Sequence, residues 1–282
     1  PGASTTWTRN DVSAPKLRTR DLCKSFEKDG ASIEVLRGLN IDIAKGEFVS
    51  IVGASGCGKT TFLRLVNGLI RASSGGAWID GREVTAPGGD IAFVFQQDGL
   101  LPWRTVLDNA IIGPELQGRN MGEARDLASS YLALVGLRGF EKHYPHELSG
   151  GMRQRVNMAR ALTAGADVLL MDEPFAALDA QTREIMQTEL SRIWSETGKT
   201  VLFVTHQIDE AVFLSDRVLV FTVRPGRLKE EVAVDLPRPR ELALKRKPEF
   251  GAYVDRIWKL IEEEVRDSIR RETEEALAAA RR

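Results

Sequence analysis

The segment "GASGCGKT", residues 53–60, matches the phosphate-binding pattern GxxxxGK[ST]. It directly follows the apolar run "FVSIV" (48–52), which predicts a buried strand, and it leads into "TTFLRLVNGL" (60–69), which predicts a helix that ends near Gly68. The pattern is informative only in this strand, loop and helix context. The sequence therefore predicts an α/β protein that binds a nucleotide through this loop.

Each part of the glycine loop has an expected role. Glycines let main-chain amides converge on the phosphates, and Lys59 reaches the terminal pair. The hydroxyl of Thr60 is expected to bind Mg²⁺, and that of Thr61 to donate to an inner phosphate. The expected ATP-binding residues of the loop are Gly53, Ala54, Ser55, Gly56, Cys57, Gly58, Lys59, Thr60 and Thr61.

Two adjacent acids follow a second apolar run in "VLLMDE" (168–173). Side chains alternate along a strand, so Asp172 and Glu173 take different positions. We expect Asp172 to hold Mg²⁺ and Glu173 to orient the attacking water or accept its proton. Two acids at the end of a strand are often only a solvated turn, but the four apolar residues before them and the glycine loop favour the catalytic interpretation.

A second candidate anion site lies in "HELSGGMRQRVNMARAL" (146–162). Ser149 stands at an expected helix start, and the amides of Gly150 and Gly151 are open to a ligand. The chain thus carries two phosphate-binding segments where a simple nucleotide-binding protein needs one.

Strand-like and helix-like segments alternate on both sides of a helical stretch, which predicts a mostly parallel core sheet with a helical insert. Short β-prone pieces before residue 48 predict an N-terminal antiparallel β subdomain. The expected domains are a flexible tail (1–16), the ATPase domain (17–237, insert about 97–165), and a connector with an amphipathic helix (238–282). The apolar residues of the expected amphipathic helix are Val254, Trp258, Ile261, Val265 and Ile269. This helix either docks on its own domain or contacts a partner.

Composition narrows the possible partners. The 282 residues include 39 Lys and Arg against 40 Asp and Glu, so no overall basic field attracts nucleic acid. Only two cysteines occur, Cys23 and Cys57, and a disulfide at Cys57 in the glycine loop would obstruct a ligand, which indicates a reducing compartment. No apolar run approaches the roughly 20 residues that cross a bilayer, and no secretory signal is visible.

Four further motifs follow the glycine loop in order: "LSGGM" (148–152), "LLMDEP" (169–174), "ALDA" (177–180) and "VTH" (204–206). With them the chain resembles the ATP-hydrolysing subunit of ABC transporters, from Leu17 to about Pro237. The likeness is strongest to importer subunits for nitrate, taurine and alkanesulfonates, where "FVFQQDGLLPWRTVLDNA" (93–110) recurs in similar form.

The resemblance implies an ATP-dependent homodimer in which each copy completes the other's site. Ser149, Gly150 and Gly151 of one copy would cover the terminal phosphate bound by the other copy. Asp179 matches the acidic residue that communicates across the dimer.

The resemblance also implies roles near the phosphates and the base. Gln96 matches the glutamine that senses Mg²⁺ and water, and His206 matches the histidine that holds the terminal phosphate. Phe26 stands where the family places an aromatic to stack on adenine, with core packing as the alternative. Three residues depart from the common pattern without removing a phosphate donor or the base: Met152, Phe26 and Ala176.

The implied partners are a transmembrane permease and, indirectly, a solute-binding protein, with the chain held at the cytoplasmic face of the membrane and no nucleic acid bound. "LLPW" (100–103) either grips the permease or packs inside the insert. One alternative is a soluble ABC ATPase acting on nucleic acid or ribosomes. Another is a P-loop kinase or GTPase, which would leave "LSGGM" unexplained.

Overall fold

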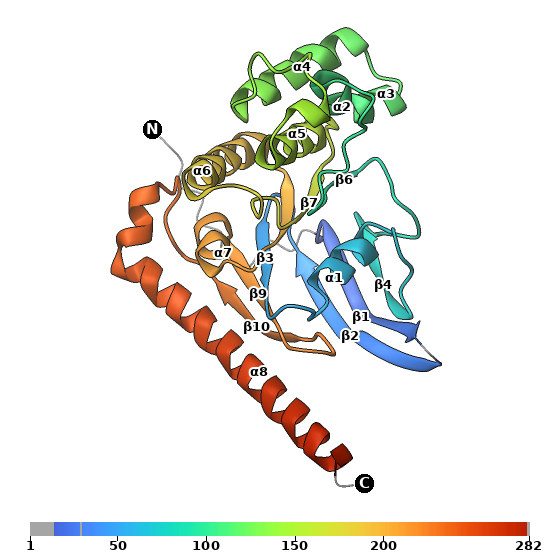
Figure 1. Cartoon of the computed structure of the whole chain (residues 1–282), viewed down its shortest axis with the longest axis vertical. Helices are drawn as coiled ribbons and strands as arrows, with labels where there is room; N and C mark the ends of the chain where they lie inside the picture. Colours follow the sequence, from blue (N-terminus) through green and yellow to red (C-terminus); the bar gives the residue numbers. More distant parts are fainter. Residues whose placement is uncertain (1–13, 29, 281–282) are drawn as a thin grey trace.

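The computed structural model describes residues 14–28 and 30–280 (Figure 1). Two sheets form its centre, one of six strands in the order β10-β9-β3-β8-β7-β6 and one of four in the order β2-β1-β4-β5. The strands are β1 (Leu17–Lys28), β2 (Ala31–Ile43), β3 (Phe48–Val52), β4 (Ser74–Ile79), β5 (Arg82–Glu83), β6 (Ile91–Val94), β7 (Val168–Asp172), β8 (Thr200–Val204), β9 (Arg217–Phe221) and β10 (Leu228–Ala233).

The helices cover the six-stranded sheet and form one end of the molecule (Figure 1). They are α1 (Lys59–Val66), α2 (Val106–Ala110), α3 (Ile112–Leu116), α4 (Met121–Leu134), α5 (Gly150–Thr163), α6 (Ala180–Thr197), α7 (Ile208–Leu214) and α8 (Pro248–Ala280), with short 3₁₀ helices η1 (Pro145–Glu147) and η2 (Leu242–Arg246). The range expected for the insert, about 97–165, contains α2 to α5.

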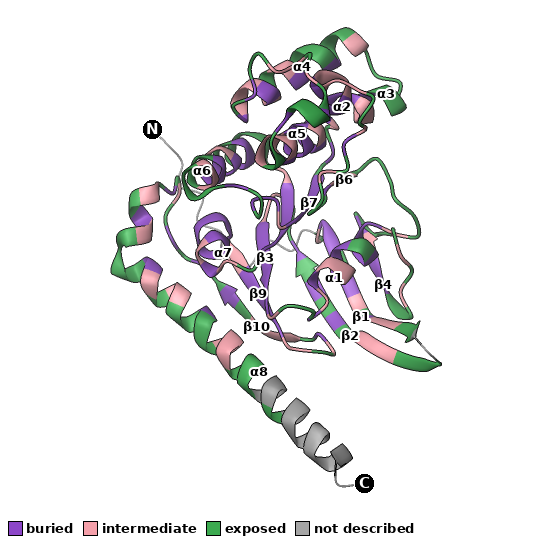
Figure 2. Ribbon diagram, in the orientation of Figure 1, coloured by how far each residue is buried: buried purple, intermediate pink, exposed green. Residues whose placement is uncertain are grey.

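The middle of the larger sheet is buried on both faces, as aliphatic strands without polar alternation require. Every residue of β3, β7 and β8 is buried (Figure 2). Leu169 and Met171 point into a core shared with the helical insert, α6 and α7. Leu170, between them, points into a core shared with α1 and the antiparallel sheet. Because successive side chains of β7 point to opposite faces of the sheet, this one strand contributes to the cores of both subdomains.

Strands β6, β7, β8 and β3 run parallel, so their carboxyl ends lie at one edge of the sheet. Ligands of open α/β sheets bind at this edge. The glycine loop follows β3, and Asp172 is the last residue of β7. Gln96 and His206 follow β6 and β8 by two residues. The fold thus carries these segments, far apart in the chain, to one place.

The N-terminal boundary differs from the expected tail of residues 1–16. Residues 1–13 lie outside the described residues, but Lys16 is buried and its ammonium pairs with Asp80 at 2.6 Å and Asp167 at 3.0 Å. The folded domain therefore includes Lys16. The two carboxylates that hold Lys16 come from distant segments, so the sequence around Lys16 did not reveal that this residue belongs to the folded domain.

The C-terminal helix α8 docks on its own domain, with Phe250 and Ile257 buried in the core shared with α7 and β10. The buried face is shifted from the predicted one, since Trp258 is 59% exposed. Ile269, the last residue of the predicted stripe, has a side chain outside those described. In the described part of the chain, no helix combines the length and hydropathy needed to cross a membrane.

Candidate active site

The glycine loop is fixed by its own lysine and by β2. The buried ammonium of Lys59 donates to the carbonyl oxygens of Gly53 at 2.8 Å and Ala54 at 3.2 Å. Gly58 begins α1 with a φ of 101°, a conformation that favours glycine, and a Cβ there would lie 2.6 Å from Leu36 Cδ2. Cys57 of the loop is itself buried, and burial raises the pKa of its thiol.

Thr60 and Asp172 bring two oxygen ligands together beside this loop. The Thr60 hydroxyl donates to Asp172 Oδ1 at 3.1 Å. Asp172 is only 3% exposed, and this burial raises the pKa of its carboxyl despite the hydrogen bond from Thr60. A hydroxyl and a carboxylate suit Mg²⁺, which proteins hold through one or two carboxylates together with substrate phosphates. No cluster of three or more His, Cys, Asp or Glu that could hold a metal exists among the described residues. A Mg²⁺ ion bound here would take further ligands from nucleotide phosphates and water.

Glu173 lies where three strand ends meet. Its Oε2 accepts a hydrogen bond from Gln96 Nε2 at 3.3 Å and lies 3.3 Å from His206 Nδ1. Glu173 has a φ of 48°, which is uncommon for a residue other than glycine and is often found at functional sites. The structure therefore brings together the three side chains that the sequence placed in catalysis.

Ser149 and Asp179 both begin helices. The Ser149 hydroxyl accepts from the amide of Met152 at 3.3 Å, and Gly150 and Gly151 form the first turn of α5. Asp179 accepts from the amide of Thr182 at 3.0 Å, and this bond is the main reason that the pKa of its carboxyl is lowered. Among the described residues, the side-chain hydrogen bonds of Ser149 and Asp179 stay within their own helix starts, and neither side chain bonds to the glycine loop of the same chain.

Polar side chains of α5 bind the backbone on both sides of Gln96, a feature that the sequence interpretation missed. The side chains of Gln154 and Asn157 both donate to the carbonyl oxygen of Phe95, at 3.1 and 3.0 Å. Arg160 donates to the carbonyl oxygen of Asp98 at 2.8 Å. Polar residues at positions 154, 157 and 160 recur at helical spacing in a largely buried helix, and this pattern was the available signal.

Exposure of two side chains bears on two open alternatives. Phe26 is 41% exposed, with the Lys24 ammonium 4.8 Å from its ring centre, so the core-packing alternative is wrong. Trp103 is 71% exposed, so it does not pack inside the insert, whereas Leu100 does.

Comparisons with known proteins agree with this geometry. The family pattern described as "ABC transporter" matches residues 36–176. The nitrate import ATP-binding protein NrtD of Synechocystis is 46% identical over 270 residues, covering 94% of this chain and 99% of the relative. The chain belongs to the ABC transporter family. As an ABC ATPase it hydrolyses ATP, and the resemblance drawn from its motifs is confirmed.

Other relatives of this ABC ATPase extend the likeness. An uncharacterised ABC transporter ATP-binding protein of Methanocaldococcus jannaschii is 48% identical, covering 93% of this chain and 97% of the relative. The taurine import ATP-binding protein TauB of Rhizobium johnstonii is 48% identical, covering 74% of this chain and 80% of the relative.

A solved structure confirms the fold of this ABC ATPase. A dimeric post-hydrolysis ATP-binding cassette bound to ADP and Pi has a TM-score of 0.72 and 32% identity, covering 78% of this chain and all of that one. The kinase or GTPase alternative is therefore wrong, and nothing in these comparisons supports action on nucleic acid.

Proposed function

We propose that this ABC ATPase powers the import of a small anion of the nitrate, taurine or sulfonate class through a separate permease. The observation that carries the proposal is the similarity to NrtD along nearly the whole of both chains, including the C-terminal extension. TauB, an import protein for another small anion, supports the same class. The chain itself has no expected contact with the solute.

We further propose that two copies act head to tail. In the part of the chain that the structure describes, Ser149, Gly150 and Gly151 have no hydrogen-bond partner in the glycine loop, and the similar cassette bound to ADP and Pi is a dimer. In this arrangement the amino end of α5 from one copy faces the terminal phosphate bound by the other copy. Asp179 would lie beside the partner's loop. Closure of the dimer would exclude water and complete a positively polarised site.

The chemistry follows from side chains already in place. Lys59 and the loop amides would bind the β- and γ-phosphates, and Phe26 would stack on adenine. When bound by Thr60, Asp172 and Gln96, Mg²⁺ supplies positive charge that offsets charge on the phosphates.

Glu173 would accept the proton of the attacking water, an effect worth about 100-fold to 10,000-fold in rate. Its position between Gln96 and His206 lets His206 hold both this carboxylate and the γ-phosphate.

Trp103 is the residue that we propose to contact the permease. It is exposed on the loop that leads into α2. The amide of Leu101 in this loop donates to Asn109 of α2, and Arg160 of α5 donates to the carbonyl oxygen of Asp98 just before the loop. Closure of the nucleotide site would thus move the insert and the permease together. The chain would be held at the cytoplasmic face of the membrane through that contact, while a solute-binding protein delivers the anion.

Reconstitution of the chain with its permease and a solute-binding protein tests this proposal. ATP-dependent uptake of nitrate, taurine or an alkanesulfonate into vesicles is expected. Trp103→Ala should abolish uptake while leaving ATP hydrolysis by the isolated chain unchanged. Trp258→Ala, another exposed tryptophan on α8, is the matched control and should retain uptake. Uptake of none of these anions would overturn the substrate class, and full uptake by Trp103→Ala would overturn the contact.

A further inference from the structure

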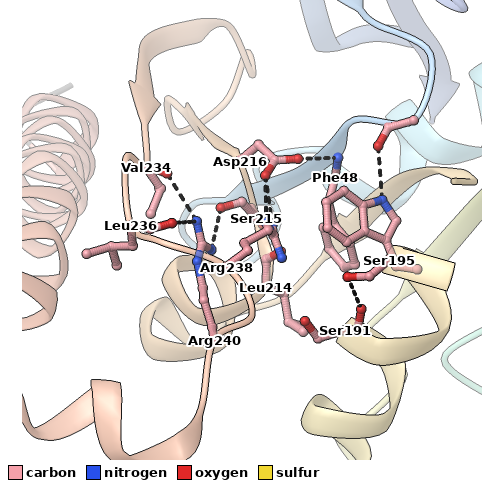
Figure 3. Close-up of polar contacts among 12 residues, drawn as sticks. Phe48, Ser191, Ser195, Leu214, Ser215, Asp216, Val234, Leu236, Arg238 and Arg240 are labelled. Atoms are coloured by element: carbon pink, nitrogen blue, oxygen red, sulfur yellow. Dashed lines mark hydrogen bonds and ion pairs between the residues drawn. The ribbon is translucent and has the colours of Figure 1, made fainter. Parts of the chain in front are cut away.

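The C-terminal extension is fastened to the end of α7, the helix that begins two residues after His206 (Figure 3). The buried guanidinium of Arg240 donates to three carbonyls at the end of α7 and two on the segment after β10. The acceptors are Val212 at 2.9 Å, Phe213 at 3.1 Å, Ser215 at 2.7 Å, Val234 at 3.1 Å and Leu236 at 3.4 Å. Carbonyls at the end of a helix lack intrahelical partners, and Arg240 supplies the missing donors.

A second arginine fixes the same segment to the core sheet (Figure 3). Arg238 donates to Asp216 Oδ1 at 2.8 Å and lies 4.0 Å from the ring centre of Trp194. The other carboxylate oxygen of Asp216 accepts from the amide of Phe48, the first residue of β3. The extension is therefore a fixed part of the ATPase domain, and it places η2 against α6 and α7.

From η2, Lys245 begins a chain of polar contacts that runs into the protein. Its ammonium donates to Gln187 Oε1 at 2.7 Å. Gln187 Nε2 in turn donates to Glu210 Oε1 at 3.3 Å. The Thr205 hydroxyl donates to Glu210 Oε2 at 2.6 Å. Gln187 and Glu210 are both buried, so each depends on these partners.

This series of polar contacts ends at Thr205 and Gln207, the two residues that flank His206. Thr205 Oγ1 also accepts from the amide of Gln207 at 3.0 Å, which fixes the backbone on both sides of the histidine. Arg183 donates to Gln207 Oε1 at 3.2 Å and to the carbonyl oxygen of Leu178 at 2.8 Å, next to Asp179. Thr205 and Gln207 thus connect these contacts to the backbone around His206, and Arg183 connects Gln207 to the loop of Asp179.

Loss of the first contact would propagate inward. Without the Lys245 ammonium, Gln187 Oε1 is a buried acceptor with no donor, and the amide would turn to find one. Glu210 would then lose the hydrogen bond from Gln187, and its hydrogen bond with the Thr205 hydroxyl would change. Two acidic side chains also face this ammonium, Glu184 and Asp209, each at 3.8 Å, and they would be left without their cation.

We propose that Lys245 is a positioning residue for ATP hydrolysis, acting on His206 through Gln187, Glu210 and Thr205. This inference rests on the proposed role of His206 and gives the C-terminal extension a part in the hydrolytic site. It assigns no contact between Lys245 and the nucleotide. Its effect should therefore fall on the rate of hydrolysis and not on ATP affinity.

Steady-state ATP hydrolysis by the full chain tests the proposal with Lys245→Met, Lys245→Arg and Lys247→Met. Lys247 is an exposed lysine two residues away and serves as the matched control. Lys245→Met should lower kcat about threefold to tenfold with KM for ATP within about twofold, because only the geometry around His206 changes. Lys245→Arg should restore the rate, and Lys247→Met should match the wild type. Should Lys245→Met fail to fold, Gln187→Met interrupts the same chain from α6 and should give the same separation of kcat from KM.

A double-mutant cycle with His206→Ala decides whether the effect passes through the histidine. In the His206→Ala background, Lys245→Met should have no further effect on kcat. An equal fold-loss in both backgrounds, or a loss that appears in KM, would overturn the proposal. A wild-type rate for both Lys245→Met and Gln187→Met would also overturn it. If His206→Ala itself hydrolyses ATP at the wild-type rate, the proposed role of His206 fails instead, so the two failures are distinguishable.

Discussion

Nδ1 of His206 lies 3.3 Å from Oε2 of Glu173, although the two residues are 33 positions apart in the sequence. They are neighbours because β7 and β8 are paired in parallel, with Asp172 opposite Val204. One chain thus assembles the groups proposed to act on water, while among the described residues Ser149 and Asp179 have no side-chain hydrogen bond to the glycine loop of that chain. If the proposal holds, hydrolysis is blocked in two different ways, by removing the proposed base or by removing the proposed contribution of the second copy.

Replacing the base should separate ATP binding from hydrolysis. Glu173→Gln keeps the size of the side chain and removes its ability to accept a proton, so hydrolysis should fall about 100-fold or more. ATP should still bind and should trap a closed dimer, visible by size-exclusion chromatography. Glu241→Gln, on the exposed residue before η2, is the control and should behave as wild type. Unchanged turnover by Glu173→Gln would remove Glu173 from its role.

Ser149 has a structural role as a helix cap and a proposed role in hydrolysis. Comparison with Asn120, which also caps a helix, distinguishes the two roles. Both Ser149 and Asn120 accept backbone amides at a helix start, and loss of either cap by alanine should lower the free energy of unfolding by about 0.5–2 kcal/mol. Only Ser149→Ala should also impair hydrolysis and ATP-dependent dimerisation. Urea unfolding and ATP turnover of both variants provide the comparison. An equal loss of turnover in Asn120→Ala would mean that Ser149 acts only as a cap.

Phe26 should affect the affinity for ATP and not the chemical step. An aromatic side chain stacked on a base is worth about 1–3 kcal/mol, so Phe26→Ala should raise KM for ATP about fivefold to 150-fold with kcat unchanged. Phe26→Tyr should retain the wild-type KM. Leu69→Ala, at another exposed apolar side chain, is the control. A normal KM in Phe26→Ala would exclude stacking.

Glu210 should make stability depend on pH in a defined direction. Burial raises the pKa of Glu210 above the ordinary glutamate value of 4.5, against the lowering effect of the Thr205 hydrogen bond. The folded state then binds more protons than the unfolded state, so the contribution of Glu210 to stability is lost as the pH rises from 4.5 through the raised folded pKa. Glu210→Gln has no such equilibrium. The free energy of unfolding of the wild type, measured relative to this variant, should fall over that interval. A relative stability that rises with pH would show that the sign is wrong.

The sequence was sufficient to predict the features that depend on local patterns and on the order of motifs along the chain. The glycine loop, the acidic pair of Asp172 and Glu173, and Gln96 and His206 each follow a β-like run. Their meeting at one edge of the sheet then follows from parallel pairing. The fold class and family membership were predictable for the same reason.

The features that sequence did not reveal depend on contacts between distant segments. Lys16 is held by two acids that lie 64 and 151 residues away. The bonds from α5 to the segment around Gln96 use the main-chain carbonyls of Phe95 and Asp98 as acceptors, and any residue type at those positions would supply them. The predicted stripe of α8 was wrong at Trp258 because the docking surface of α7 and β9, and not the helix pattern, selects the buried face.

The most direct test of the account is the dependence of ATP hydrolysis on protein concentration. If each site needs the LSGG segment of a second copy, the rate per chain should fall towards zero on dilution below the concentration that supports the ATP-bound dimer. The chain should be assayed free of permease, with its monomeric state at the lowest concentrations verified by light scattering. A rate per chain that stays at its full value in verified monomers would contradict the proposal that one copy holds only half of the site.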